Sequence, residues 1–211
     1  MKKLLPLLFI LVLFGCDKNK QIVPQPHVYD AIFIGDSITA NWNKESKGHP
    51  GFFSENNFLC LGFSGKTSGY LKTLFNKGVT EKHPKATVIL CGTNDIAQND
   101  GVYVSNEEIC DNIAWMAAEA AGSGIKVVLC SVLPSTHFYW ASSIQPADAI
   151  IQLNVLIKAL AEEKGYAYVD YYSALVDSNK GLPSQYSSDG CHPNQAGYTV
   201  MENLILPVLQ N

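Results

Sequence analysis

Five short apolar segments, separated by stretches with helical periodicity, constrain the fold of this chain more than any other feature. They are Ala31–Ile34, Phe58–Gly62, Ala86–Cys91, Lys126–Val132 and Ala167–Asp170. The third segment shows no alternation of apolar and polar residues, which is typical of a strand buried on both faces. Strands that alternate with helices at this spacing predict right-handed β-α-β crossovers and a parallel sheet. We therefore expect an α/β fold, a three-layer sandwich whose five-stranded parallel sheet has the flavodoxin-like order 2-1-3-4-5.

The stretches between the predicted strands carry apolar residues at helical spacing. Helices are expected over residues 38–44, from about Gly69, over residues 106–121 and 147–164, and after Pro193. Gly165 is the expected stop of the fourth of these helices. Because Gly48, Pro50 and Gly51 lie close together, the segment that contains them is predicted to be a loop.

The first 28 residues differ in pattern from the rest of the chain. Lys2 and Lys3 precede an apolar run of twelve residues ending at Gly15, and a transmembrane helix needs about 20. We therefore expect a signal peptide over residues 1–15. The end of this run, Leu13-Phe14-Gly15-Cys16, resembles a bacterial lipoprotein signal. This resemblance implies a lipidated Cys16, a tether over residues 16–28, and an exported protein anchored by its lipid at a membrane of the cell envelope. The alternative is an ordinary secretory signal, in which Cys16 has no such role.

The folded domain is then expected over residues 29–211, and its charge argues against nucleic acid as a partner. From residue 16 onward the chain carries 13 lysines, 19 acidic residues and no arginine, a net charge of −6. Nucleic acids are bound through clustered lysine and arginine side chains, and arginine is the usual bidentate partner of phosphates and carboxylates. The composition favours a substrate whose reacting end is neutral.

Five cysteines remain after Cys16, an odd number that cannot all pair. Three of them, Cys60, Cys91 and Cys130, lie in predicted strands, where cysteine usually acts as a small buried hydrophobe. No Cys-x-x-Cys spacing suggests zinc. We expect no disulfide framework and at most one bridge.

Several polar residues directly follow predicted strands. Ser37, Gly65 and Asn94 come just after the first three strands, and ligands of open α/β sheets bind at the carboxyl ends of the strands. Ser37 could act as a nucleophile, although Asp36 and Ser37 could also serve only to cap the next helix. Near the C-terminus, Asp189 lies three residues before His192, a spacing that lets a carboxylate reach Nδ1 of the imidazole and orient it as a general base.

Four blocks of sequence contain these residues: Gly35-Asp36-Ser37, Gly62-Phe63-Ser64-Gly65, Gly92-Thr93-Asn94-Asp95 and Asp189-Gly190-Cys191-His192-Pro193. In this order they resemble the blocks of the GDSL-type esterases, which belong to the SGNH hydrolase superfamily. The resemblance extends over the whole predicted domain. It implies that Ser37 is the nucleophile, that His192 is the general base and that Asp189 is its partner. It further implies an oxyanion hole made of the N–H groups of Ser37 and Gly65 and the side-chain amide of Asn94, with no cofactor and no metal.

The substrate implied by these patterns is a carboxylic ester, of a small molecule or a glycan. An exported location and short predicted loops favour a short-chain, acetyl esterase that acts on carbohydrate or related small esters. The aromatic segment Ser135–Trp140, together with Trp42, could form a wall beside Ser37, and aromatic faces suit sugar rings. The chain pattern also resembles the platelet-activating-factor acetylhydrolase branch of the superfamily, so a (lyso)phospholipid acylhydrolase is the alternative enzyme.

Three other functions are alternatives to ester hydrolysis. The segment Gly62–Thr67 ends in Gly-Lys-Thr but lacks the first glycine of a phosphate-binding P-loop. A metal hydrolase would need Asp36, Asp95, Asp189 and His192 to lie close together as metal ligands. The chain offers no second histidine in a suitable place for such a site. A non-catalytic glycan-binding module could use the same cleft, but it would not require the complete set of catalytic residues.

Overall fold

A computed structural model describes residues 29–210 and contains the predicted parallel sheet. The strands are β1 (Ala31–Gly35), β2 (Phe58–Gly62), β3 (Ala86–Leu90), β4 (Lys126–Cys130) and β5 (Ala167–Val169). All neighbouring strands are parallel, and the order β2-β1-β3-β4-β5 is the one predicted. Residues 1–28, with the predicted signal peptide, Cys16 and tether, lie outside the described residues.

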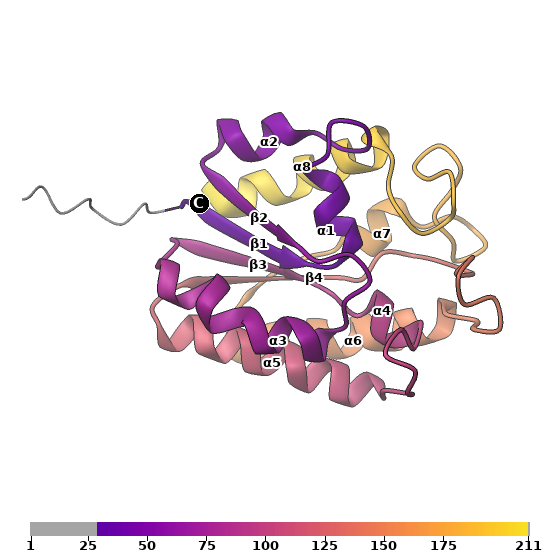
Figure 1. Cartoon of the computed structure of the whole chain (residues 1–211), viewed down its shortest axis with the longest axis horizontal. Helices are drawn as coiled ribbons and strands as arrows, with labels where there is room; N and C mark the ends of the chain where they lie inside the picture. The colour runs from indigo at the N-terminus through magenta and orange to yellow at the C-terminus, as the bar shows by residue number, and fades with distance from the viewer. Residues whose placement is uncertain (1–28, 211) are drawn as a thin grey trace, which may run out of the picture.

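Helices cover both faces of the sheet, so the molecule has three layers (Figure 1). The helices are α1 (Ser37–Trp42), α2 (Pro50–Glu55), α3 (Ser68–Gly78), the 3-10 helix η1 (Thr80–Lys82), α4 (Thr93–Ile96), α5 (Asn106–Gly122), α6 (Ala147–Lys164), α7 (Tyr171–Leu175) and α8 (Gln195–Gln210). Helices α3, α5 and α6 pack on one face, and α1, α2, α7 and α8 pack on the other. None of the helices within residues 29–210 is long and apolar enough to cross a membrane.

The central strand β1 explains why the sheet is buried on both sides. Its side chains alternate between two separate cores: Ile32 and Ile34 join the core under α3, α5 and α6, whereas Ala31 and Phe33 join the other. Because successive residues of a strand point to opposite faces, a strand covered on both sides must be apolar throughout. This is the pattern that distinguishes these strands in the sequence.

The segment predicted as a loop around Pro50 is instead the start of helix α2. Proline suits the first turn of a helix because its missing N–H would have no partner there. The helix is fixed by Phe52 and Phe53, whose rings contact Phe33 of β1 at centroid distances of 5.9 and 5.3 Å. Tertiary packing therefore overrides the turn signal of the neighbouring glycines.

The expected elements otherwise lie where they were predicted, with ends displaced by one or two residues. Three further short helices were not predicted: α4 and α7, which directly follow strands β3 and β5, and the 3-10 helix η1. All five described cysteines are free thiols, and three of them (Cys91, Cys130 and Cys191) are fully buried. Burial raises the pKa of the Cys130 thiol to about 12, so this thiol stays neutral and packs as an apolar group.

Candidate active site

The carboxyl ends of β1, β2 and β3 bring the predicted site residues to one edge of the sheet. Here a cleft of about 240 Å³ is lined by Ser37, Ser64, Gly65, Asn94, Asn99, Tyr139, Trp140 and His192. We refer to it as the nucleophile cleft. The residues that line this cleft come from the loops after three strands, from the 131–146 loop and from the segment before α8. They lie together because the topology of the sheet brings these segments to the same edge.

Ser37 is the first residue of α1 and follows a very tight turn from β1. A Cβ on Gly35 would overlap the carbonyl oxygen of Leu90 and the hydroxyl of Thr39, so only glycine fits at this position. Asp36 is the N-cap, and its Oδ1 accepts a hydrogen bond from Ile38 N–H at 2.9 Å. The cap and the glycine together hold Ser37 at the sheet edge, where its side chain is half-buried.

The hydroxyl of Ser37 lies 2.9 Å from Nε2 of His192, across 155 residues of sequence. On the other side of the ring, Nδ1 of His192 lies 2.8 Å from Oδ2 of Asp189. A carboxylate accepts but does not donate, so Asp189 requires the proton on Nδ1 and leaves Nε2 free to accept from Ser37. This geometry can remove a proton from the serine hydroxyl as the hydroxyl attacks a carbonyl carbon.

The carboxylate of Asp189 is itself held in place by several donors. Oδ1 accepts from the backbone N–H groups of Cys191 at 3.0 Å and His192 at 2.8 Å, and from the hydroxyl of Ser187 at 3.1 Å. Partial burial opposes ionisation of Asp189, but the hydrogen bonds from His192 and Cys191 outweigh it and lower the pKa of Asp189 to about 2. The carboxylate therefore remains charged at ordinary pH. Ser187, which the sequence did not single out, is 2% exposed and belongs to this network.

The oxyanion donors predicted from the sequence face the same cleft. Gly65 has a φ of +76°, which favours glycine, and among residues 29–210 neither its N–H nor that of Ser37 has a hydrogen-bond acceptor. Asn94 is only 2% exposed, and its Nδ2 donates to the carbonyl oxygen of Lys66 at 3.0 Å. An amide nitrogen carries two hydrogens, so the second one remains available to a ligand in the cleft.

Known proteins with similar sequences and structures belong to the same class of enzyme that this geometry suggests. The model of the GDSL-like lipase/acylhydrolase family matches residues 33–200. The chain belongs to that family. Since this is a family of lipases and acylhydrolases, which cleave carboxylic esters, the protein is an ester hydrolase.

Among solved structures, two from Bacteroides are similar to this esterase. A Bacteroides fragilis protein assigned as an acylhydrolase has 40% identity and a TM-score of 0.81, covering 85% of this chain and 86% of its own. A GDSL-like lipase from Bacteroides thetaiotaomicron has 39% identity and a TM-score of 0.81, covering 85% and 87%. The fold is shared by a variant of an acetyl-xylooligosaccharide esterase from Geobacillus stearothermophilus, which has 19% identity and a TM-score of 0.69. This match covers 89% of the present chain and 97% of the Geobacillus chain. No curated protein matches the chain.

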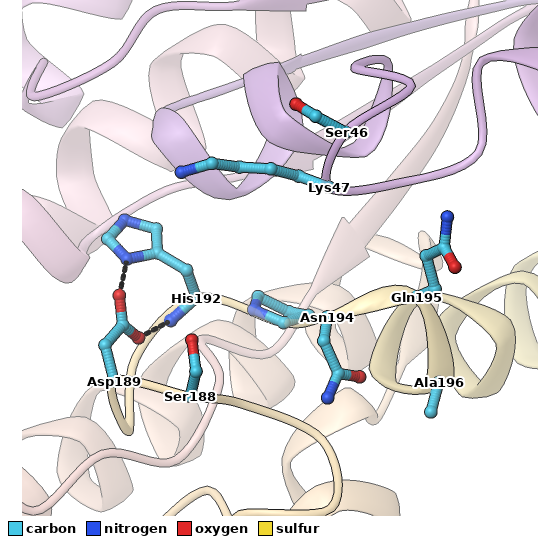
Figure 2. A pocket seen from close by; sticks show the side chains of 9 residues that line it. Ser46, Lys47, Ser188, Asp189, His192, Asn194, Gln195 and Ala196 are labelled. Carbon is cyan, nitrogen blue, oxygen red and sulfur yellow. Dashed lines mark hydrogen bonds and ion pairs between the residues drawn. The ribbon is translucent and has the colours of Figure 1, made fainter.

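A second hollow of about 620 Å³ is also bordered by His192 (Figure 2). Its lining is Ser46, Lys47, Ser188, Asp189, His192, Pro193, Asn194, Gln195 and Ala196. We refer to it as the polar hollow. Figure 2 shows the side chain of Lys47 extending across it from the loop after α1 toward the imidazole. His192 is the residue that the esterase's nucleophile cleft and the polar hollow have in common.

The aromatic wall expected beside Ser37 is only partly present in the esterase. Tyr139 and Trp140 line the nucleophile cleft, and the Trp140 ring lies 5.9 Å from the His192 ring. Trp42 was wrongly placed in this wall: it is 1% exposed, and its indole stacks between Phe52 and Tyr198. The helical turn after Ser37 directs Trp42 into the core, where its Nε1 donates to Glu202 at 2.9 Å.

Two residues on which the alternative functions depended, Asp95 and Lys66, pack against neighbouring side chains of the esterase. Asp95 binds the hydroxyl and backbone N–H of Ser68 at the start of α3, at 2.6 to 3.0 Å. The amino group of Lys66, the lysine of the P-loop-like segment, lies 4.5 Å from the centre of the Tyr70 ring. Within residues 29–210, no three His, Cys, Asp or Glu side chains are grouped so that they could hold a metal ion.

Asp36 should make the stability of the esterase depend on pH. Its burial, opposed by the Ile38 N–H and reinforced by the charge of Asp95, raises its pKa to about 7. The ordinary pKa is about 3.9, so between these values the folded state binds more protons than the unfolded state. The contribution of Asp36 to the free energy of unfolding is therefore fully present below about pH 4 and is lost as pH rises toward 7.

We expect Asp36→Asn to remove this dependence, since the amide oxygen can still cap Ile38 but does not titrate. The difference in unfolding free energy between wild type and variant should change by on the order of a few kcal/mol across this window. Urea unfolding at several pH values from 4 to above 7 measures it. Parallel stability curves for the two proteins would contradict the assignment.

Proposed function

We propose that this esterase removes short acyl groups, acetyl above all, from carbohydrate or related small polar esters. The proposal rests on one observation: a small nucleophile cleft and a larger polar hollow meet at His192. In acyl transfer, Ser37 attacks the carbonyl carbon and its proton passes to His192, while Ser37 N–H, Gly65 N–H and Asn94 stabilise the oxyanion. His192 then protonates the departing alcohol oxygen, and water repeats both steps on the acyl-enzyme.

The two spaces differ in what they could hold. The acyl group must lie beside the oxyanion donors, in a cleft of about 240 Å³ that Tyr139 and Trp140 also line. The alcohol must lie beside His192, which the polar hollow of about 620 Å³ also borders. Its lining of serine, lysine, asparagine and glutamine side chains offers hydrogen bonds to the hydroxyl groups of a polar alcohol. This arrangement favours a small acyl group on a polar alcohol.

A series of p-nitrophenyl esters tests the size of the acyl group. We expect kcat/KM to be highest for acetate and to fall through butyrate and octanoate to palmitate, since the longer chains exceed the nucleophile cleft. Acetate release from acetylated xylo-oligosaccharides then tests the alcohol. A maximum at octanoate or beyond would favour the (lyso)phospholipid acylhydrolase, and absence of hydrolysis with every ester would favour a glycan-binding module.

We further propose that the esterase is exported and held at the cell envelope by a lipid on Cys16. The support is the sequence pattern alone: two lysines, an apolar run and a cysteine at its end. Cells fed an alkyne fatty acid should label the wild type but not Cys16→Ala, and the wild type should sediment with membranes. Equal labelling of both proteins would contradict the proposal.

A further inference from the structure

The side chain of Asn99, in the turn after α4, connects three parts of the nucleophile cleft. Its Nδ2 donates to Oδ1 of Asn94 at 2.7 Å and to the carbonyl oxygen of Gly65 at 3.2 Å. Its Oδ1 accepts from Nε1 of Trp140 at 2.8 Å. The same carboxamide therefore contacts two residues of the predicted oxyanion hole and the aromatic side chain that lies beside His192.

The chemistry of these partners fixes which way the Asn99 carboxamide points. An indole nitrogen only donates and a backbone carbonyl only accepts. The oxygen of Asn99 must therefore face Trp140, and its nitrogen must face Gly65 and Asn94. A reversed amide would place two donors together at Trp140 and two acceptors together at Gly65.

The orientation of the Asn99 carboxamide in turn determines the orientation of the Asn94 amide. Because Asn99 presents a nitrogen, Asn94 must present its oxygen to it, which leaves the Asn94 nitrogen on the other side. There one hydrogen of that nitrogen is bonded to the carbonyl oxygen of Lys66, and the second is not used. A reversed Asn94 would present an acceptor to the cleft, and an acceptor repels an oxyanion.

We propose that Asn99 is a positioning residue of the esterase, which together with the Lys66 carbonyl holds the Asn94 amide with its nitrogen toward the reacting carbonyl. Asn94 is buried, and within residues 29–210 Asn99 is the only hydrogen-bond donor to its side-chain oxygen. The contact with Trp140 extends the network to the wall of the cleft that a substrate touches. The inference rests on the proposed function, because it concerns the same oxyanion hole.

Two substitutions separate loss of the bond from reversal of its direction. Asn99→Ala removes the carboxamide and with it the only donor to the Asn94 oxygen among the described residues, so kcat for p-nitrophenyl acetate should fall about fivefold, the effect of one net hydrogen bond. Asn99→Asp is nearly isosteric but presents only acceptors, so its charged carboxylate should draw the nitrogen of Asn94 away from the Lys66 carbonyl and toward itself. Its loss should approach that of Asn94→Ala, roughly 10²–10³ in kcat for an oxyanion donor. Asn76→Ala, which removes an exposed amide bonded to Glu119, is the matched control and should leave kcat unchanged.

A double-mutant cycle tests whether Asn99 acts through Asn94. In the Asn94→Ala background, the further loss from Asn99→Ala and from Asn99→Asp should shrink to less than about threefold, with KM little changed. Equal losses in both backgrounds, or losses that appear in KM alone, would overturn the proposal. Thermal unfolding confirms that each variant is folded. If Ser37→Ala abolishes hydrolysis but the Asn99 variants keep wild-type kcat, only the role of Asn99 is refuted. If Ser37→Ala remains active, the proposed function is refuted.

Discussion

Replacing Ser37 by alanine should lower kcat for p-nitrophenyl acetate by about 10⁶-fold, to the level set by binding and oxyanion donors alone. The substitution removes the hydroxyl that lies 2.9 Å from His192 Nε2, and no other hydroxyl in the cleft has this contact among the described residues. KM should change little, because the hydroxyl contributes to the transition state rather than to binding. A fluorophosphonate probe should label the wild type and leave Ser37→Ala unlabelled.

Ser64 provides the matched control, since its exposed hydroxyl lines the same cleft without contacting His192. Ser64→Ala should keep kcat within about tenfold of wild type and should still be labelled. The serine and histidine act as one unit, so adding His192→Ala to Ser37→Ala should cost almost nothing more. A Ser37→Ala protein that retains a tenth of wild-type turnover would show that another group attacks the ester.

The sequence was sufficient to predict the parts of this molecule that follow from periodicity and topology. Apolar strands without alternation predict a sheet covered on both faces, and crossovers of one hand predict a parallel sheet. Once the sheet is parallel, residues directly after β1, β2 and β3 must lie at one edge. The proximity of Ser37, Gly65 and Asn94 was therefore predictable although 57 residues separate the first from the last.

Contacts between side chains from distant loops were not predictable in this way. Trp42 was expected in an aromatic wall beside Ser37, but the rotation of α1 buries it against α2 and α8. Asn99 and Ser187 have no motif, and their roles depend on hydrogen bonds whose partners are fixed only in the folded chain. Helix α2 was missed because its signal is the packing of Phe52 and Phe53 rather than local propensity.

Asp189→Asn should lower kcat by about 10⁴-fold, although it changes a single atom of the side chain. Oδ1 of Asp189 accepts from the backbone N–H groups of Cys191 and His192, and the amide oxygen of asparagine can keep both bonds. These donors therefore force the new NH₂ group toward Nδ1 of His192. An NH₂ group donates, so it favours the tautomer with the proton on Nε2, which cannot accept from Ser37.

The predicted loss is specific to this carboxylate and does not come from a missing turn contact. Asp170→Asn is the matched control, because Asp170 also accepts hydrogen bonds from a residue three positions later but lies outside both the nucleophile cleft and the polar hollow. It should retain full kcat, and both variants should unfold cooperatively. Since the pKa of Asp189 is about 2, the wild type should show no titration of this group at ordinary assay pH. If Asp189→Asn keeps kcat within tenfold of wild type, the tautomer of His192 must be set by another group.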